Sequence, residues 1–178
     1  AFAATLCLIV AHMAQAASPT LGNILPRGAQ RGTDAEIRFL GGNLEDAIDL
    51  VFHEPGISLK QVVSAAAGEF KVILTIAPDC ALGRHAIRVR TKSGLSNLFI
   101  FSVGALPEIA ETEPNSDAGH AQAVALGTTV NGIAQNEDVD YFAVDLAQGQ
   151  KLAAEVEAIR LGHALFDPIG RSVRLANA

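Results

Sequence analysis

Short runs in which apolar and polar residues alternate occupy most of the chain between positions 18 and 104. The longest stripe is Phe70, Val72, Leu74 and Ile76, and shorter ones are Ile37 with Phe39, Ile48 with Leu50 and Phe52, and Phe99 with Phe101 and Val103. Alternation with a period of two is typical of strands that bury one face. Turn residues separate these runs at Gly41-Gly42-Asn43, Glu54-Pro55-Gly56, Pro78-Asp79 and Lys92-Ser93-Gly94. The pattern predicts an antiparallel β-sandwich over residues 18–104.

A second alternating region follows a short break. Pro107 restricts its own φ and disfavours helix in the residue before it, so residues 105–110 are predicted to be an extended linker. Alternation then resumes in Val124–Leu126, Val130–Ile133, Phe142–Leu146 and Leu152–Ala158, with Gln148-Gly149-Gln150 as a hairpin turn. A second all-β domain is therefore predicted over residues 111–178.

The first 17 residues carry no charge and end in the small-x-small pattern Ala14-Gln15-Ala16. This is typical of the apolar helix and cleavage site of a secretory signal peptide. The run is shorter than the roughly 20 apolar residues that span a membrane, although a buried N-terminal helix remains an alternative. Without an initiating Met or a basic n-region, the sequence is expected to lack its true beginning. The mature protein is predicted to be secreted, periplasmic or on the cell surface, and not an integral membrane protein.

Composition excludes several classes of function. The chain has 178 residues, a net charge of -6 and 13 scattered Lys and Arg, which argues against nucleic acid as a partner. Aromatic residues make up only 5%, so stacking platforms for sugars are scarce. Cys7 lies in the predicted signal, which leaves Cys80 without a partner for a disulfide. No motif for a nucleophile, a phosphate loop or a zinc protease occurs, so we expect no catalysis by this chain itself.

The first region resembles the IPT/TIG domain. The residues that carry the resemblance are Leu25-Pro26-Arg27-Gly28, Arg31-Gly32-Thr33, Leu40-Gly41-Gly42-Asn43-Leu44 and, in the closing hairpin, Gly83, Gly94 and Ser96-Asn97. The resemblance implies an immunoglobulin-like fold and a binding or spacer role.

The second region resembles the bacterial pre-peptidase C-terminal domain. The matching residues are Glu111-x-Glu113-Pro114-Asn115, Val130-Asn131-Gly132, Asp138-Val139-Asp140-Tyr141-Phe142 and Gly149-Gln150. The resemblance implies a jelly-roll-like sandwich, found beside secreted peptidases, of which residues 111–178 would be an incomplete copy. The two domains in this order resemble exported proteins of planctomycete-type bacteria.

Oxygen-bearing side chains concentrate at the start of the second region. They are Glu111, Glu113, Asn115 and Asp117, which alternate along an extended segment, and Asp138 and Asp140, which precede Tyr141. Calcium takes six to eight such oxygens, so these six residues could hold one Ca²⁺ if the fold brings the two loops together. Some relatives with the second domain bind calcium through an equivalent segment. The resemblance therefore implies the same role for five of the six residues, Glu111, Glu113, Asn115, Asp138 and Asp140. The alternative is that these residues cap turns in a solvated junction.

The sequence thus predicts a non-catalytic interaction or positioning module of a larger extracellular protein, with a protein or a polysaccharide as partner. Two alternatives remain open. One is an accessory region of a secreted hydrolase, such as a peptidase, with its catalytic domain outside these residues. The other is a carbohydrate or matrix adhesin.

Overall fold

The computed structural model describes residues 17–133, 135 and 138–158. The predicted signal peptide and the last part of the predicted second domain, 159–178, lie outside the described residues. All the regular structure in the described residues is β, which confirms the predicted all-β class. The described chain holds no helix with the length and apolar character to cross a membrane.

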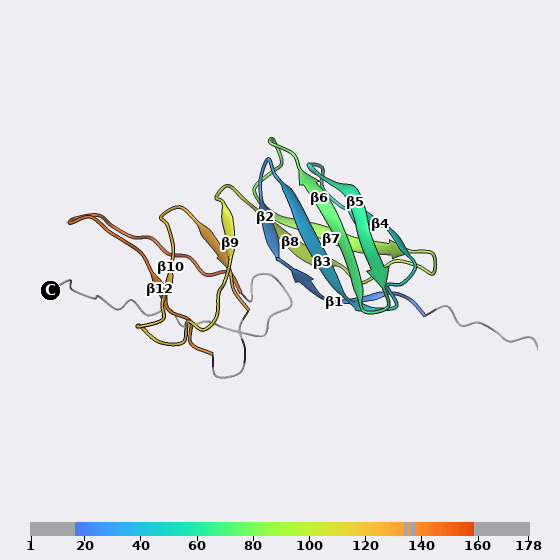
Figure 1. The fold of residues 1–178 in the computed structure, drawn as a ribbon. Helices are drawn as coiled ribbons and strands as arrows, with labels where there is room; N and C mark the ends of the chain where they lie inside the picture. The colour runs from blue at the N-terminus through green and yellow to red at the C-terminus, as the bar shows by residue number, and fades with distance from the viewer. Residues whose placement is uncertain (1–16, 134, 136–137, 159–178) are drawn as a thin grey trace, which may run out of the picture.

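Eight strands form two four-stranded sheets (Figure 1). One sheet has the order β1 (Thr20–Leu25), β3 (Asp34–Gly42), β6 (Glu69–Ile76), β5 (Ile57–Ala66). The other has the order β2 (Gly28–Gln30), β8 (Phe99–Gly104), β7 (Gly83–Thr91), β4 (Ala47–Phe52). Every pair is antiparallel, as predicted, except β2 with β8, where the chain crosses to the second sheet and runs beside its last long strand.

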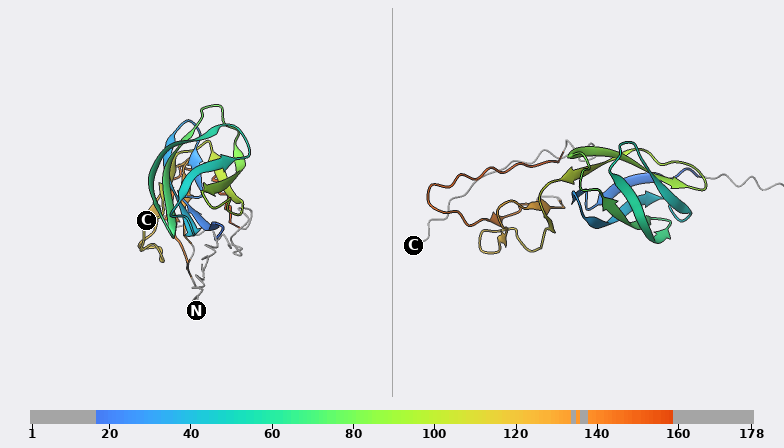
Figure 2. Two further views of the ribbon diagram at one scale, coloured as in Figure 1. Left: turned by 90° about the vertical axis from the view of Figure 1, so that its right-hand side faces the viewer. Right: turned by 90° about the horizontal axis from the view of Figure 1, so that it is seen from above.

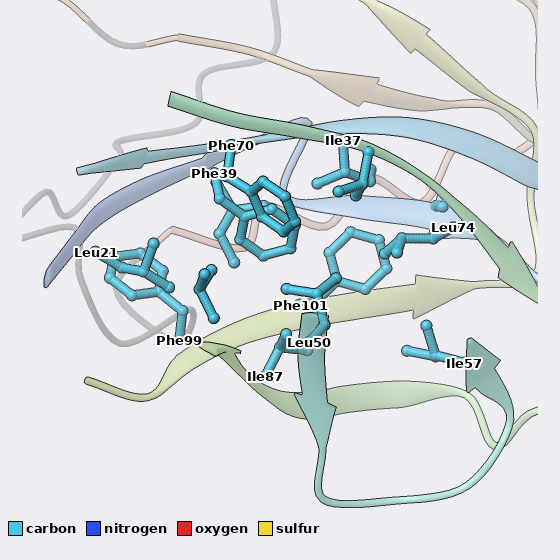
Figure 3. Close-up of a cluster of buried hydrophobic side chains, with 14 of the residues drawn as sticks. Leu21, Ile37, Phe39, Leu50, Ile57, Phe70, Leu74, Ile87, Phe99 and Phe101 are labelled. Atoms are coloured by element: carbon cyan, nitrogen blue, oxygen red, sulfur yellow. The ribbon is translucent and has the colours of Figure 1, made fainter. Parts of the chain in front are cut away.

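The two sheets bury a single apolar core (Figure 3). Inward and outward positions alternate strictly along β6, so Phe70, Val72, Leu74 and Ile76 are all buried as the sequence predicts. The Phe39 and Phe70 rings from neighbouring strands lie 6.3 Å apart between centroids. Full burial of each such side chain contributes about 1.5–3 kcal/mol. The buried cluster runs from Leu21 to Val103.

The prediction for one alternating run, Ile48 with Leu50 and Phe52, is wrong at Ile48. Ile48 was expected inside with Leu50 and Phe52, but Ile48 is 48% exposed and Ala47 takes the buried position. The register of β4 against β7 shifts between Ala47 and Asp49. A bulge of this kind inserts one extra residue and reverses the faces of the residues beyond it.

Four short strands follow the sandwich, and we call residues 105–158 the second unit. β9 (Glu108–Ala110) pairs in parallel with β11 (Thr129–Asn131), and β10 (Gln122–Ala123) pairs in parallel with β12 (Phe142–Ala143). Parallel strands require a crossover rather than a hairpin, and here the chain 111–128 returns between β9 and β11. Figure 2 shows the second unit beyond one end of the sandwich.

Several predictions for the second unit need correction. The predicted linker 105–110 includes β9, because the Pro107 carbonyl accepts a hydrogen bond from Thr129 N at 2.9 Å. The predicted turn at 148–150 is present, with Gln150 N donating to Ala147 O at 3.0 Å, yet the flanking residues 144–146 and 151–158 are not in strands. No apolar side chain is buried in the described part of the second unit. Within the described residues, its alternating side chains therefore have no opposing layer that would bury them.

Candidate metal centre

Three carboxylates of the second unit converge. Ligand oxygens of Glu111, Glu113 and Asp140 all lie within 4.8 Å of one another. Glu111 is half-buried and the other two are exposed. Oxygens on opposite sides of a calcium ion, each about 2.4 Å from it, lie about 4.8 Å apart. The spacing of this cluster therefore suits a hard divalent cation, and we refer to these three residues as the acidic cluster.

Backbone pairing places Glu111. It directly follows β9 and extends the pairing with β11, since Glu111 N donates to Asn131 O at 3.0 Å. Its Oε2 accepts from Ile133 N at 2.8 Å, and its Oε1 accepts from Asn115 Nδ2 at 2.9 Å. Glu111 thus ties the end of β9 to the end of β11 and to the next turn, so its position is fixed by three chain segments.

Asn115 brings the second loop to the cluster. Its carbonyl accepts from Tyr141 N at 2.9 Å, which sets residue 140 beside the Glu111–Asn115 segment. Asn115 is 0% exposed, and its Oδ1 has no hydrogen-bond partner among the described residues. A buried carbonyl oxygen without a donor is costly. A cation or an N–H donor at this place would satisfy it.

The charges in the cluster repel each other. Burial, followed by the charges of Glu111 and Asp138, raises the pKa of Asp140 to about 6. Asp138 is close enough to act on Asp140, and its Oδ2 accepts from Gln135 N at 2.9 Å. The cluster therefore favours either a proton or a metal ion, since both remove like-charge repulsion.

The structure brings together most, but not all, of the six predicted ligands. Glu111, Glu113 and Asp140 form the acidic cluster, Asn115 contacts Glu111, and Asp138 acts on Asp140. Asp117 instead caps a turn, accepting from Gly119 N at 2.8 Å and His120 Nδ1 at 2.8 Å. The His120 hydrogen bond is the main reason why the pKa of Asp117 is lowered. Asp117 therefore caps a turn, as in the alternative interpretation of the sequence, and is not part of the acidic cluster.

A cavity of about 170 Å³ adjoins the acidic cluster, a feature that the sequence did not reveal. Its lining combines carboxylates, amides and apolar groups, from Ala110, Glu111, Glu113, Asn131, Ile133 and Gln135. Asn131, Ile133 and Gln135 carried no signal in the sequence as ligand-binding residues. The pairing of β11 with β9 is what brings them to Glu111.

A second contact that the sequence missed joins Cys80 and His85. Cys80 Sγ lies 3.8 Å from His85 Nε2, which also lies 2.7 Å from Ala81 O. Burial raises the pKa of the Cys80 thiol, so the thiolate is disfavoured. The pair is part of the sandwich core and has the character of a structural contact.

Comparison with known families bears on the sandwich. Residues 18–102 match the family described as quinohemoprotein amine dehydrogenase, alpha subunit domain III. This part of the chain is an immunoglobulin-like β domain. The expectation of an immunoglobulin-like fold is therefore confirmed, while the narrower IPT/TIG and pre-peptidase C-terminal assignments stay predictions.

Comparison with solved structures gives distant matches. One is the Bacteroides ovatus mixed-linkage glucan utilization locus protein SGBP-B in complex with a mixed-linkage heptasaccharide, at 15% identity and a TM-score of 0.39. The match covers 61% of this chain and 25% of that chain, so the chain spans only about a quarter of its length. None of the curated proteins matches this chain.

Proposed function

We propose that this chain is a non-catalytic interaction and positioning module of an extracellular protein, and that its second unit binds a divalent cation, with calcium as the best fit. Glu111, Glu113 and Asp140 would supply carboxylate oxygens, with Asp138 adding negative charge. The observation that best supports a bound cation is the buried Asn115. Among the described residues no donor reaches its Oδ1, while its Nδ2 donates to Glu111 of the cluster. All the candidate ligands are hard oxygens, as calcium requires.

The division of the chain supports the module role. The sandwich has its own closed core, and some of its surface charges are paired across the strands, as in Arg38 with Glu69 and Arg90 with Asp49. A scaffold of this kind holds loops and neighbouring domains in fixed positions. Secretion and two tandem sandwiches belong to the same proposal. So does the alternative of an accessory region beside a secreted hydrolase.

Titration calorimetry with calcium chloride tests the cation. The full chain, freed of metal with chelator, is expected to bind one Ca²⁺ per molecule. Asp140→Asn is expected to weaken that binding at least tenfold, since it removes a charged ligand at the centre of the cluster. The matched control is Asp145→Asn, which neutralises a carboxylate outside the cluster and is expected to leave the affinity unchanged. Absence of heat from the wild-type chain, or equal affinity in both variants, would remove the cation from the proposal.

A further inference from the structure

The connection between the sandwich and the second unit is short and is bonded on both sides. Only residues 105–107 separate the end of β8 from the start of β9. On the sandwich side, Gln30 Nε2 donates to Ala105 O at 3.2 Å. On the side of the second unit, Thr129 N donates to Pro107 O at 2.9 Å. The orientation of the second unit therefore depends on the contacts made at this junction rather than on a free tether.

The Glu108 side chain lies between the two units. Its Oε1 is 3.4 Å from the place where a β-carbon on Gly28 of β2 would stand, and 3.6 Å from the corresponding place on Gly104 of β8. Its Oε2 accepts a hydrogen bond from Asn131 Nδ2 of β11 at 2.7 Å. One carboxyl oxygen thus lies against the backbone of the sandwich, while the other is bonded to the second unit. We call this set of four residues the junction contact.

The surroundings of Glu108 are neutral. The strands that pack against it, β2, β8 and β11, contain no Asp, Glu, Lys, Arg or His. Arg27 and Arg31 flank β2, but Arg27 donates to Asn23 Oδ1 at 2.9 Å, and Arg31 is near enough to Cys80 to act on its thiol. A carboxylate that is partly buried among neutral groups loses hydration without gaining an opposite charge. The junction contact therefore suits a neutral, protonated carboxyl better than an ionised one.

We propose that protonation of Glu108 fixes the orientation of the second unit relative to the sandwich, and that its ionisation loosens the junction contact. Burial raises the pKa of Glu108, and the hydrogen bond from Asn131 opposes that rise only in part. The closed junction therefore holds this proton more tightly than a junction that has opened to water. The stabilisation is fully present below the ordinary pKa of 4.5 and is lost as pH rises through the raised value.

The inference rests on the proposed role as a positioning module, since such a module acts through the fixed orientation of its parts. It does not depend on the cation, because Glu108 lies outside the acidic cluster. The second unit is then held rigidly in acid and reorients more freely at neutral pH.

The test is a measurement of residual dipolar couplings on the ¹⁵N-labelled full chain in chelator, at about pH 4 and about pH 8. Alignment tensors are fitted separately to residues 20–104 and 108–133. A rigid junction gives both parts the same tensor, and reorientation reduces the tensor of one part relative to the other. The wild-type tensors are expected to agree at the lower pH and to differ by at least about a fifth at the higher pH.

Two variants assign the effect to Glu108. Glu108→Gln keeps the size and the acceptor for Asn131 but carries no charge, so its two tensors are expected to agree at both pH values. Asp140→Asn neutralises the other carboxyl whose pKa is raised, and is expected to keep the wild-type dependence on pH.

The carboxyl ¹³C shift of Glu108 gives a direct second readout, with an expected midpoint above 4.5. A midpoint at or below that value, tensors that do not change with pH in the wild-type chain, or an equal change in Glu108→Gln would each overturn the inference. These measurements contain no calcium, so their failure leaves the calorimetric test of the cation standing.

Discussion

The sandwich and the second unit are built from the same alternating pattern, yet they are held together by different interactions. In the sandwich, each stripe meets an opposing sheet, and side chains such as Phe39 and Phe101 are completely buried. In the described part of the second unit, the fully buried side chain is a polar one, Asn115. Alternation gives a strand an apolar face, but only an opposing layer gives that strand stability. In the described part of the second unit, the side chains that converge are carboxylates and an amide instead of apolar groups.

The largest expected effect is a loss of stability when a side chain in the core of the sandwich is truncated. Phe39→Ala should reduce the free energy of unfolding by about 3–5 kcal/mol, because it leaves a cavity in the centre of the core. Urea denaturation followed by circular dichroism measures the loss. Val63→Ala, at a position that is 44% exposed, should change stability by less than about 0.5 kcal/mol. Equal effects of the two substitutions would show that the core is not where the structure has it.

The next largest expected effect is the stabilisation of the second unit by calcium. At a free concentration of 100 times its Kd, calcium should stabilise the second unit by about 2.7 kcal/mol. The gain should appear as slower amide exchange at Glu111, Ile133 and Tyr141, whose N–H groups donate across the cluster. In Asp140→Asn the gain should be absent. An undiminished gain in this variant would mean that calcium binds elsewhere.

A smaller effect comes from pH in the absence of calcium. The pKa of Asp140 is about 6 in the folded chain against an ordinary 3.8, so the folded state holds this proton more tightly than the unfolded state. The resulting stabilisation is fully present below about pH 4 and is lost as pH rises through about 6. Protection factors of the Tyr141 amide in chelator should therefore rise between pH 7 and pH 5. Asp140→Asn should flatten this dependence, and an equally steep profile in that variant would exclude Asp140 as its cause.

The smallest effect concerns Asp117. Its carboxylate is 64% exposed and pairs with His120 in a turn. Asp117→Asn should leave both calcium affinity and the melting temperature unchanged, as measured by calorimetry. A loss of calcium affinity comparable with that of Asp140→Asn would place Asp117 among the ligands after all.

The sequence predicts the sandwich well where local pattern and fold agree. The stripe from Phe70 to Ile76 is buried as predicted, whereas Ile48 is exposed because a bulge, which leaves no mark in the pattern, shifts the register of β4. In the second unit, the parallel pairings and the strand β9 inside the predicted linker depend on contacts between distant segments.

The candidate site shows the same limit. Glu111, Glu113 and Asn115 are close in sequence, so their meeting could be expected. The hydrogen bond from Tyr141 N to Asn115 O brings Asp140 to them, and the pairing of β11 with β9 brings Ile133 to the cavity. The sequence alone can identify candidate ligands that lie close together along the chain. It cannot identify the residues that pairing between distant segments brings next to them.

Hydrogen exchange of the full chain, in chelator and in saturating calcium, tests the central claim most directly. Calcium is expected to increase the protection of amides in residues 108–143 and to leave that of residues 20–104 unchanged. Protection that is the same in both conditions throughout the chain, or that increases equally in the sandwich, would contradict it.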